Sequence, residues 1–190
     1  FTGLEIISSG KNKITIKSFL TIDNEQILPL ITKLFQLVRM IADNIAEEWN
    51  DINIADISTI INQDLRKLRD HCLRSIQVTK YGGNKSYDYY DLVTQLEKLA
   101  VSFLYLAKFV VAKKPKKKVL LKTMQENLAS LYKSFLKKDL SFSTKMWDEF
   151  SKQTEKEFSP DILKSTLKKE STLFLYYYNI TLQMRHIASR

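Results

Sequence analysis

The sequence predicts an all-α protein: a six-helix assembly of two packed three-helix bundles, preceded by a short extended N-terminal arm. Two observations favour this fold class. Only four glycines and three prolines occur in 190 residues, so the elements should be long. Apolar residues recur at intervals of three and four over most of the chain, which is the period of one helix face.

Residues 1–22 are expected to form an extended arm or a hairpin. The apolar stretch Leu4 to Ile7 is followed by Ser8-Ser9-Gly10, which is a turn signal, and then by Ile14 and Ile16 in alternation. A lone hairpin is marginally stable in water, so the arm should need support from the helices.

Residues 23–112 are expected to form the first three-helix bundle. Its first helix should begin at Asp23-Asn24, since both residue types cap helix N-termini. The second should run over residues 56–81 and stop at Gly82-Gly83, and the third should begin near Ser86.

Residues 113–118 (KKPKKK) are expected to form a basic linker, because a proline among five lysines cannot continue a packed helix. Residues 119–190 should then form the second bundle. Its first helix carries Leu120 and Met124, its second is capped near Ser143, and its third begins at Ser159-Pro160, a cap followed by proline.

The amino-acid composition limits the classes of protein to which this chain can belong. The single cysteine, Cys72, excludes an internal disulfide framework and favours a cytoplasmic setting, with the nucleus as the alternative. No apolar stretch is long enough to cross a bilayer.

Residues 1–95 carry a net charge of −1 and residues 96–190 a net charge of +10, so the second half is the basic half. The chain opens with Phe1, and we expect it to be a fragment of a larger protein.

Catalytic residues, a metal site and a cofactor site are not predicted. His71 and His186 are the two histidines, and His71 and Cys72 point about 100° apart on a helix, so they should not ligate one ion. Gly82-Gly83 lacks the rest of a phosphate-binding loop. The acidic residues between Glu47 and Asp56 have no calcium-loop spacing and are interpreted as a charged helix junction.

A basic patch is expected around the linker. Its lysines are Lys113, Lys114, Lys116, Lys117, Lys118, Lys122 and Lys133. Four interpretations fit such a run: a solvated linker, a nuclear import signal, a contact to nucleic-acid phosphates, or a contact to an anionic membrane surface.

Large aromatic residues are the candidates for partner binding. Tyr176, Tyr177 and Tyr178 point in three directions from one helix, so at least one should face solvent or a partner. With Phe103 and Phe109 they form the predicted set of groove residues. A central helix buried on two sides would explain the three tyrosines equally well.

The last predicted helix resembles the C-terminal region of the autophagy-initiating serine/threonine kinases. The similarity lies in Tyr178, Leu182-Gln183-Met184 and Ala188, with two further short matches at Ile41-Ala42-Asp43 and at Leu96, Lys98, Leu99 and Ala100. That region consists of two MIT-type three-helix modules in tandem. The resemblance implies an adaptor-docking region, separate from a kinase domain elsewhere in the parent protein, and a regulatory subunit as partner. Thr181 and Ile187 depart from the small residues that the family favours.

The leading hypothesis is a non-catalytic interaction module that binds amphipathic helices of a partner in its inter-helix grooves. The rival hypothesis is a basic helical RNA- or DNA-binding protein, which would bind phosphates through the lysines of the patch.

Overall fold

A computed structural model describes residues 4–10, 13–18, 24–115, 119–137, 148, 152 and 171–188. Its helices are α1 (Asn24–Glu47), α2 (Ile54–Thr59), α3 (Arg66–Thr79), α4 (Ser86–Lys113), α5 (Val119–Lys137) and α8 (Ser171–Ala188). A π-helical turn (Ile60–Leu65) joins α2 to α3, and a 3-10 turn (Gly83–Lys85) precedes α4. The strands are β1 (Leu4–Gly10) and β2 (Lys13–Ser18).

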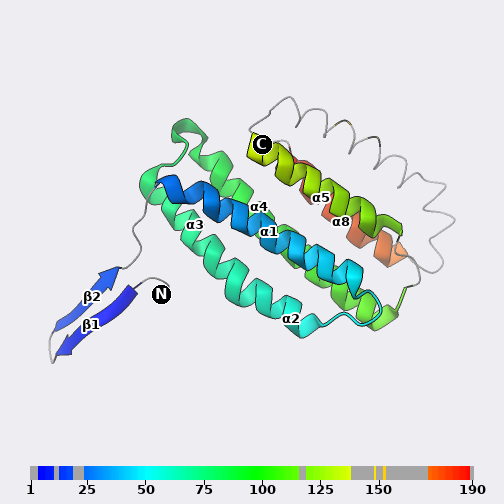
Figure 1. Cartoon of the computed structure of the whole chain (residues 1–190), viewed down its shortest axis with the longest axis horizontal. Helices are drawn as coiled ribbons and strands as arrows, with labels where there is room; N and C mark the ends of the chain where they lie inside the picture. Colours follow the sequence, from blue (N-terminus) through cyan, green and yellow to red (C-terminus); the bar gives the residue numbers. More distant parts are fainter. Residues whose placement is uncertain are drawn as a thin grey trace.

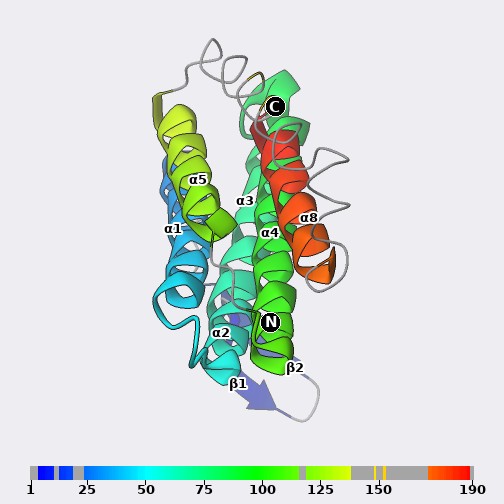
Figure 2. The ribbon, with the colours of Figure 1, turned by 90° about the vertical axis from the view of Figure 1, so that its right-hand side faces the viewer.

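The helices form three layers. Helices α1 and α4 contact each other in the middle layer, α3 packs against both of them, and α5 and α8 cover the opposite side (Figure 1). Helix α5 lies along α1 and α8 lies along α4, and α5 and α8 also touch (Figure 2). The predicted helical class is therefore confirmed by the packing of five helical rods among the described residues, in which α2 and α3 count as one.

One continuous core joins all of these helices. The buried apolar residues of α1 and α4 form a single cluster with those of α3, α5 and α8. The stripe of apolar residues at helical spacing on α4 is buried and consists of Leu92, Leu96, Leu99, Ala100, Phe103, Leu106, Ala107 and Val110. The division into two three-helix bundles remains a prediction, because its fifth helix, expected from Ser143, lies outside the described residues.

Local sequence explains where the second rod begins. Asn53 caps α2, since its side-chain Oδ1 accepts hydrogen bonds from the backbone N–H groups of Ala55 and Asp56 at 3.1 and 3.3 Å. The predicted start at Asp56 is therefore two residues late, because α2 begins at Ile54. The predicted end at residue 81 is also two residues late: α3 ends at Thr79, and Lys80 adopts the left-handed conformation two residues before Gly82.

The π-helical turn between α2 and α3 lies among core residues. Ile57, Ile61 and Leu65 are all buried and lie four residues apart, a spacing that an ordinary α-helix also places on one face. The turn contacts both α1 and α4.

The N-terminal segment forms a two-stranded antiparallel hairpin. Leu4 pairs with Ser18 and Gly10 pairs with Lys13, and the register shifts between Ile6 and Ser8. The turn expected at Ser8-Ser9-Gly10 is wrong, because these residues belong to β1. The shift in register is a β-bulge, which places one extra residue, Ile7, on β1.

Several predictions concern residues that the structure does not describe. The linker residues Lys116, Lys117 and Lys118, the helix expected from Ser143 and the Ser159-Pro160 start signal all lie outside the described residues. Lys113, assigned to the linker, is the last residue of α4. The helix continues to that point because the break falls at Lys114, which adopts the left-handed conformation just before Pro115.

Candidate functional site

Two of the predicted groove residues are core residues. Phe103 on α4 is fully buried, and Tyr177 on α8 is only 2% exposed. The expectation that they contact a partner is corrected by this burial, since a partner cannot reach them while the helices are packed. Both side chains instead help to hold α8 in the shared core.

The remaining predicted aromatics lie at the surface or at its edge. Phe109 on α4 and Tyr176 on α8 are half-buried and pack together, with ring centroids 5.4 Å apart. Their contact closes the seam between the two helices. Tyr178 is 37% exposed, as expected for at least one member of the tyrosine run.

The outer face of α8, which we define by Leu175, Tyr178 and Leu182, is apolar although it is not part of the core. The spacing of three and four residues places these side chains on one side of the helix. Leu175 is 60% exposed and Leu182 is half-buried. A helix that buries one apolar side normally carries polar residues on the other, so this face needs an explanation. Its sequence signal was the occurrence of aromatic and aliphatic residues on several sides of the helix at 171–188.

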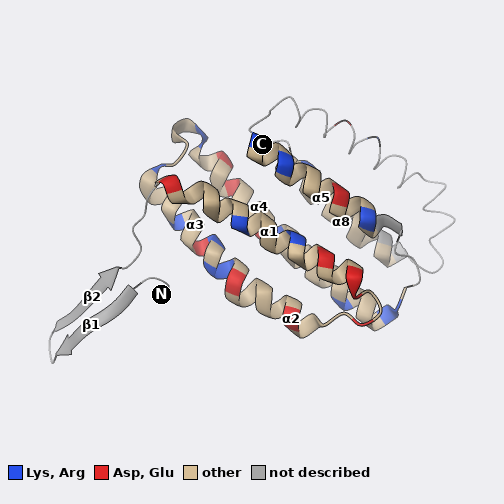
Figure 3. Ribbon diagram, viewed as in Figure 1, with Lys and Arg blue, Asp and Glu red and all other residues tan. Residues whose placement is uncertain are grey.

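The lysines of the predicted patch are solvated where the structure describes them. Lys113, Lys114 and Lys133 are exposed. Lys122 lies 3.9 Å from Glu126 one turn further on α5, and both side chains are largely exposed. Acidic and basic segments occur at the same end of the bundle, where α1 and α4 both finish (Figure 3). The described surface is therefore mixed in charge there.

Groups able to perform acid–base or metal chemistry do not converge within the described parts of the chain. No set of three His, Cys, Asp or Glu side chains in those ranges is placed to hold a metal ion. Cys72 is fully buried, and burial raises the pKa of its thiol to about 12, which keeps it protonated and unreactive. His186 lies 3.3 Å from Asp91, an interaction that ties α8 to α4.

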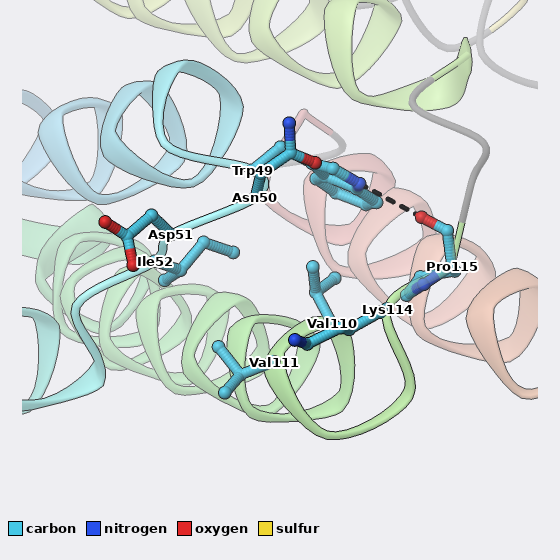
Figure 4. Close-up of a pocket in the computed structure, with 8 residues that line it drawn as sticks. All are labelled: Trp49, Asn50, Asp51, Ile52, Val110, Val111, Lys114 and Pro115. Carbon is cyan, nitrogen blue, oxygen red and sulfur yellow. Dashed lines mark hydrogen bonds between the residues drawn. The ribbon is translucent and has the colours of Figure 1, made fainter.

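A pocket opens where α1 and α4 finish, and we call it the end pocket. Its volume is about 740 Å³. It is lined by Trp49, Asn50, Asp51, Ile52, Val110, Val111, Lys114 and Pro115 (Figure 4). The indole Nε1–H of Trp49 donates to the carbonyl oxygen of Pro115 at 3.1 Å, so one wall is fixed to the other. Sequence reasoning missed this pocket, because Trp49 and Pro115 are far apart in the chain.

Comparisons with protein-family models, with curated proteins and with solved structures find no match to this chain. None of the described helices combines the length and the apolarity that crossing a bilayer requires. The described residues thus define a helical bundle with an apolar outer face on α8 and a pocket at one end.

Proposed function

We propose that this chain is a non-catalytic protein-interaction module that binds an amphipathic helix of a partner protein along the outer face of α8. The observation that carries the proposal is the exposure of Leu175 and Tyr178 on the same side of α8 as Leu182. Single exposed apolar residues are ordinary, but several on one helix face mark a surface that gains from being covered.

The size of that gain favours helix docking. Full burial of one leucine or phenylalanine side chain stabilises a complex by about 1.5–3 kcal/mol. Three neighbouring side chains at helical spacing match the anchors that an amphipathic helix presents at its own three- and four-residue intervals. The half-buried Phe109–Tyr176 pair lies at the α4 edge of α8 and adds aromatic surface there.

The resemblance to the autophagy-initiating kinases supports the same site. Of the residues that carry it, Met184 and Ala188 are buried and account for packing, whereas Tyr178 is exposed and Leu182 is half-buried. We propose on this basis an adaptor-docking region built from two three-helix modules, with the regulatory subunit of such a kinase as the partner. This proposal places the protein in the cytoplasm, with peripheral contact to membranes through its lysines.

The experiment is a pull-down with the whole chain as bait, after nuclease treatment, comparing wild type with Leu175→Asp and Tyr178→Asp. The matched control is Val78→Asp on α3, because Val78 is 62% exposed and lies on a different helix. A specific partner should be lost from both α8 variants and retained by the control. Equal retention by all four proteins would contradict docking on α8.

The same experiment distinguishes the rival nucleic-acid hypothesis from helix docking when nuclease is omitted and the salt concentration is varied. Phosphate contacts by lysines release counterions, so such binding should fall steeply with salt. Apolar docking should persist. Anionic vesicles provide the third arm, since binding through the lysines alone should also be lost at high salt and should be unaffected by Leu175→Asp.

A further inference from the structure

The end pocket has the volume of a ligand site, and polar and apolar residues both line it. Its volume of about 740 Å³ falls within the range of roughly 300–1,000 Å³ that is typical of small-molecule sites. Trp49, Ile52 and Val110 are buried residues that form an apolar floor, and Val111 is 43% exposed at its edge. An apolar floor of this kind favours a ligand with a hydrocarbon body.

The two charged side chains that line the pocket, those of Lys114 and Asp51, point in different directions. The Lys114 side chain runs from the end of α4 alongside Val110 and Val111, while the Asp51 carboxylate is turned away (Figure 4). No ion pair to Lys114 occurs among the residues that the structure describes. The C-terminal end of α4 carries partial negative charge, which does not attract an anion. The ammonium group of Lys114 is therefore the feature of the pocket that would attract one.

The position of Lys114 is fixed by the backbone on both sides. Its own N–H donates to the carbonyl oxygen of Val110 at 2.8 Å, and it adopts the left-handed conformation with φ 46° and ψ 54°. The carbonyl of the next residue, Pro115, accepts the hydrogen bond from Trp49. These bonds fix the backbone of the site before a ligand binds, so only side chains such as that of Lys114 have to order.

We propose that the end pocket binds a carboxylate carried on an apolar body, with Lys114 Nζ contacting the carboxylate and Trp49, Ile52, Val110 and Val111 contacting the apolar part. This site is separate from the outer face of α8 and does not depend on the proposed function. Two sources offer the same chemistry, a fatty-acid-like amphiphile and the C-terminus of an apolar peptide.

The test is calorimetric titration of the whole chain with octanoate, with the neutral analogue 1-octanol and with N-acetyl-leucyl-leucine. Lys114→Met keeps the aliphatic stem and removes the charge, so it should weaken octanoate binding about tenfold and change octanol binding less than twofold. Lys122→Met is the control, because Lys122 is an equally charged and largely exposed lysine on α5. It should leave all three affinities unchanged.

A second readout locates the ligand. The chain has two tryptophans, and Trp49→Phe identifies the indole N–H resonance of the pocket tryptophan in a nitrogen-correlated NMR spectrum. Octanoate should shift that resonance, and Val111→Asp should abolish the shift by placing a carboxylate in the pocket. The proposal is overturned if neither carboxylate binds, if Lys114→Met binds octanoate as tightly as wild type, or if the Trp49 resonance does not move. Tighter binding of the dipeptide assigns the site to peptide ends, and tighter binding of octanoate assigns it to free amphiphiles.

Discussion

The indole Nε1–H of Trp49 and the carbonyl oxygen of Pro115 lie 3.1 Å apart, and their hydrogen bond joins the end of α1 to the chain that leaves α4. Trp49 is 6% exposed although α1 ends at Glu47, so its side chain remains in the core after the helix has stopped. This bond sets the direction in which the chain leaves α4 toward α5, and it fixes two walls of the end pocket.

Replacement of Trp49 by phenylalanine should therefore measure how much this hydrogen bond contributes to the free energy of unfolding. The variant keeps an aromatic ring but leaves the half-buried Pro115 carbonyl without its donor, at an expected cost of about 1 kcal/mol. The corresponding fall in Tm is about 2–4 °C for a chain of this size. Trp49→Ala, which also loses the packing, should cost about 3–5 kcal/mol. Equal urea midpoints for Trp49→Phe and wild type would show that the bond contributes nothing to stability.

The turn between α3 and α4 offers a prediction with an internal control. Gly82 and Gly83 both have positive φ angles, 80° and 57°, where a side chain costs about 1–2 kcal/mol. A Cβ on Gly82 would also lie 2.7 Å from Cε2 of the Tyr89 ring, whereas one on Gly83 would meet nothing within 4 Å. Tyr89 packs against Tyr81 with ring centroids 4.8 Å apart and cannot move without losing that contact.

We expect Gly82→Ala to lower the free energy of unfolding by about 2–4 kcal/mol and Gly83→Ala by about 1–2 kcal/mol. Urea unfolding of the two single variants checks the order. Introducing Tyr89→Ala into both should bring their costs together, because the obstructing ring is then absent. A larger effect at Gly83 than at Gly82 would contradict the contact with Tyr89.

The core could be predicted from the sequence because it follows the helical period. The buried set of α4 matches its apolar stripe, and α1 and α4 begin at Asn24 and Ser86, where the sequence predicts their starts. The π-turn was not predicted, because the four-residue spacing of Ile57, Ile61 and Leu65 fits an ordinary α-helix equally well.

The surface features could not be predicted in the same way. Aromatic and aliphatic residues occur on several sides of the helix at 171–188, so periodicity does not reveal that Tyr177 points inward and Tyr178 outward. Which tyrosine is buried depends on where α4 and α5 pack. The end pocket depends on a long-range contact between Trp49 and Pro115, and a single sequence carries no signal for such a pairing.

The ion pairs between α3 and α4 should contribute more to the free energy of unfolding than the ion pairs on the surface. Glu97 on α4 accepts hydrogen bonds from Arg66 and Arg69, and its side chain is only 15% exposed. Burial lowers the pKa of the Arg69 guanidinium, but the hydrogen bonds and charges of Glu97 and Asp70 outweigh it, so the pKa is raised. Glu97→Gln would leave a half-buried guanidinium without its main partner.

We expect Glu97→Gln to cost about 1–3 kcal/mol in the free energy of unfolding. Glu126→Gln is the control, since it removes an exposed pair with Lys122 and should cost about 0.5 kcal/mol or less. Urea unfolding at low and high salt distinguishes the two sites, because salt screens exposed pairs more than half-buried ones. Similar costs for both variants would mean that Glu97 is solvated in solution.

Cys72 should make the protein less stable at alkaline pH. Burial raises the pKa of its thiol from 9.0 to about 12, so between these values the unfolded chain loses the proton while the folded chain keeps it. The contribution of the protonated thiol to the free energy of unfolding is fully present below pH 9 and falls by about 1.4 kcal/mol per pH unit above it. The pKa of Tyr81 is also raised, mainly by burial, and it responds in the same direction.

Comparison with Cys72→Ala isolates the thiol, because Tyr81 and the lysines are common to both proteins. The difference in the free energy of unfolding between wild type and variant should be constant from pH 7 to about pH 8.5. It should then shrink by up to about 1.4 kcal/mol per pH unit, since only the wild type carries the thiol whose ionisation favours unfolding. A difference that stays constant up to pH 10.5 would show that the thiol ionises equally well in both states, and hence that Cys72 is not held in the dry core between α1, α3 and α4.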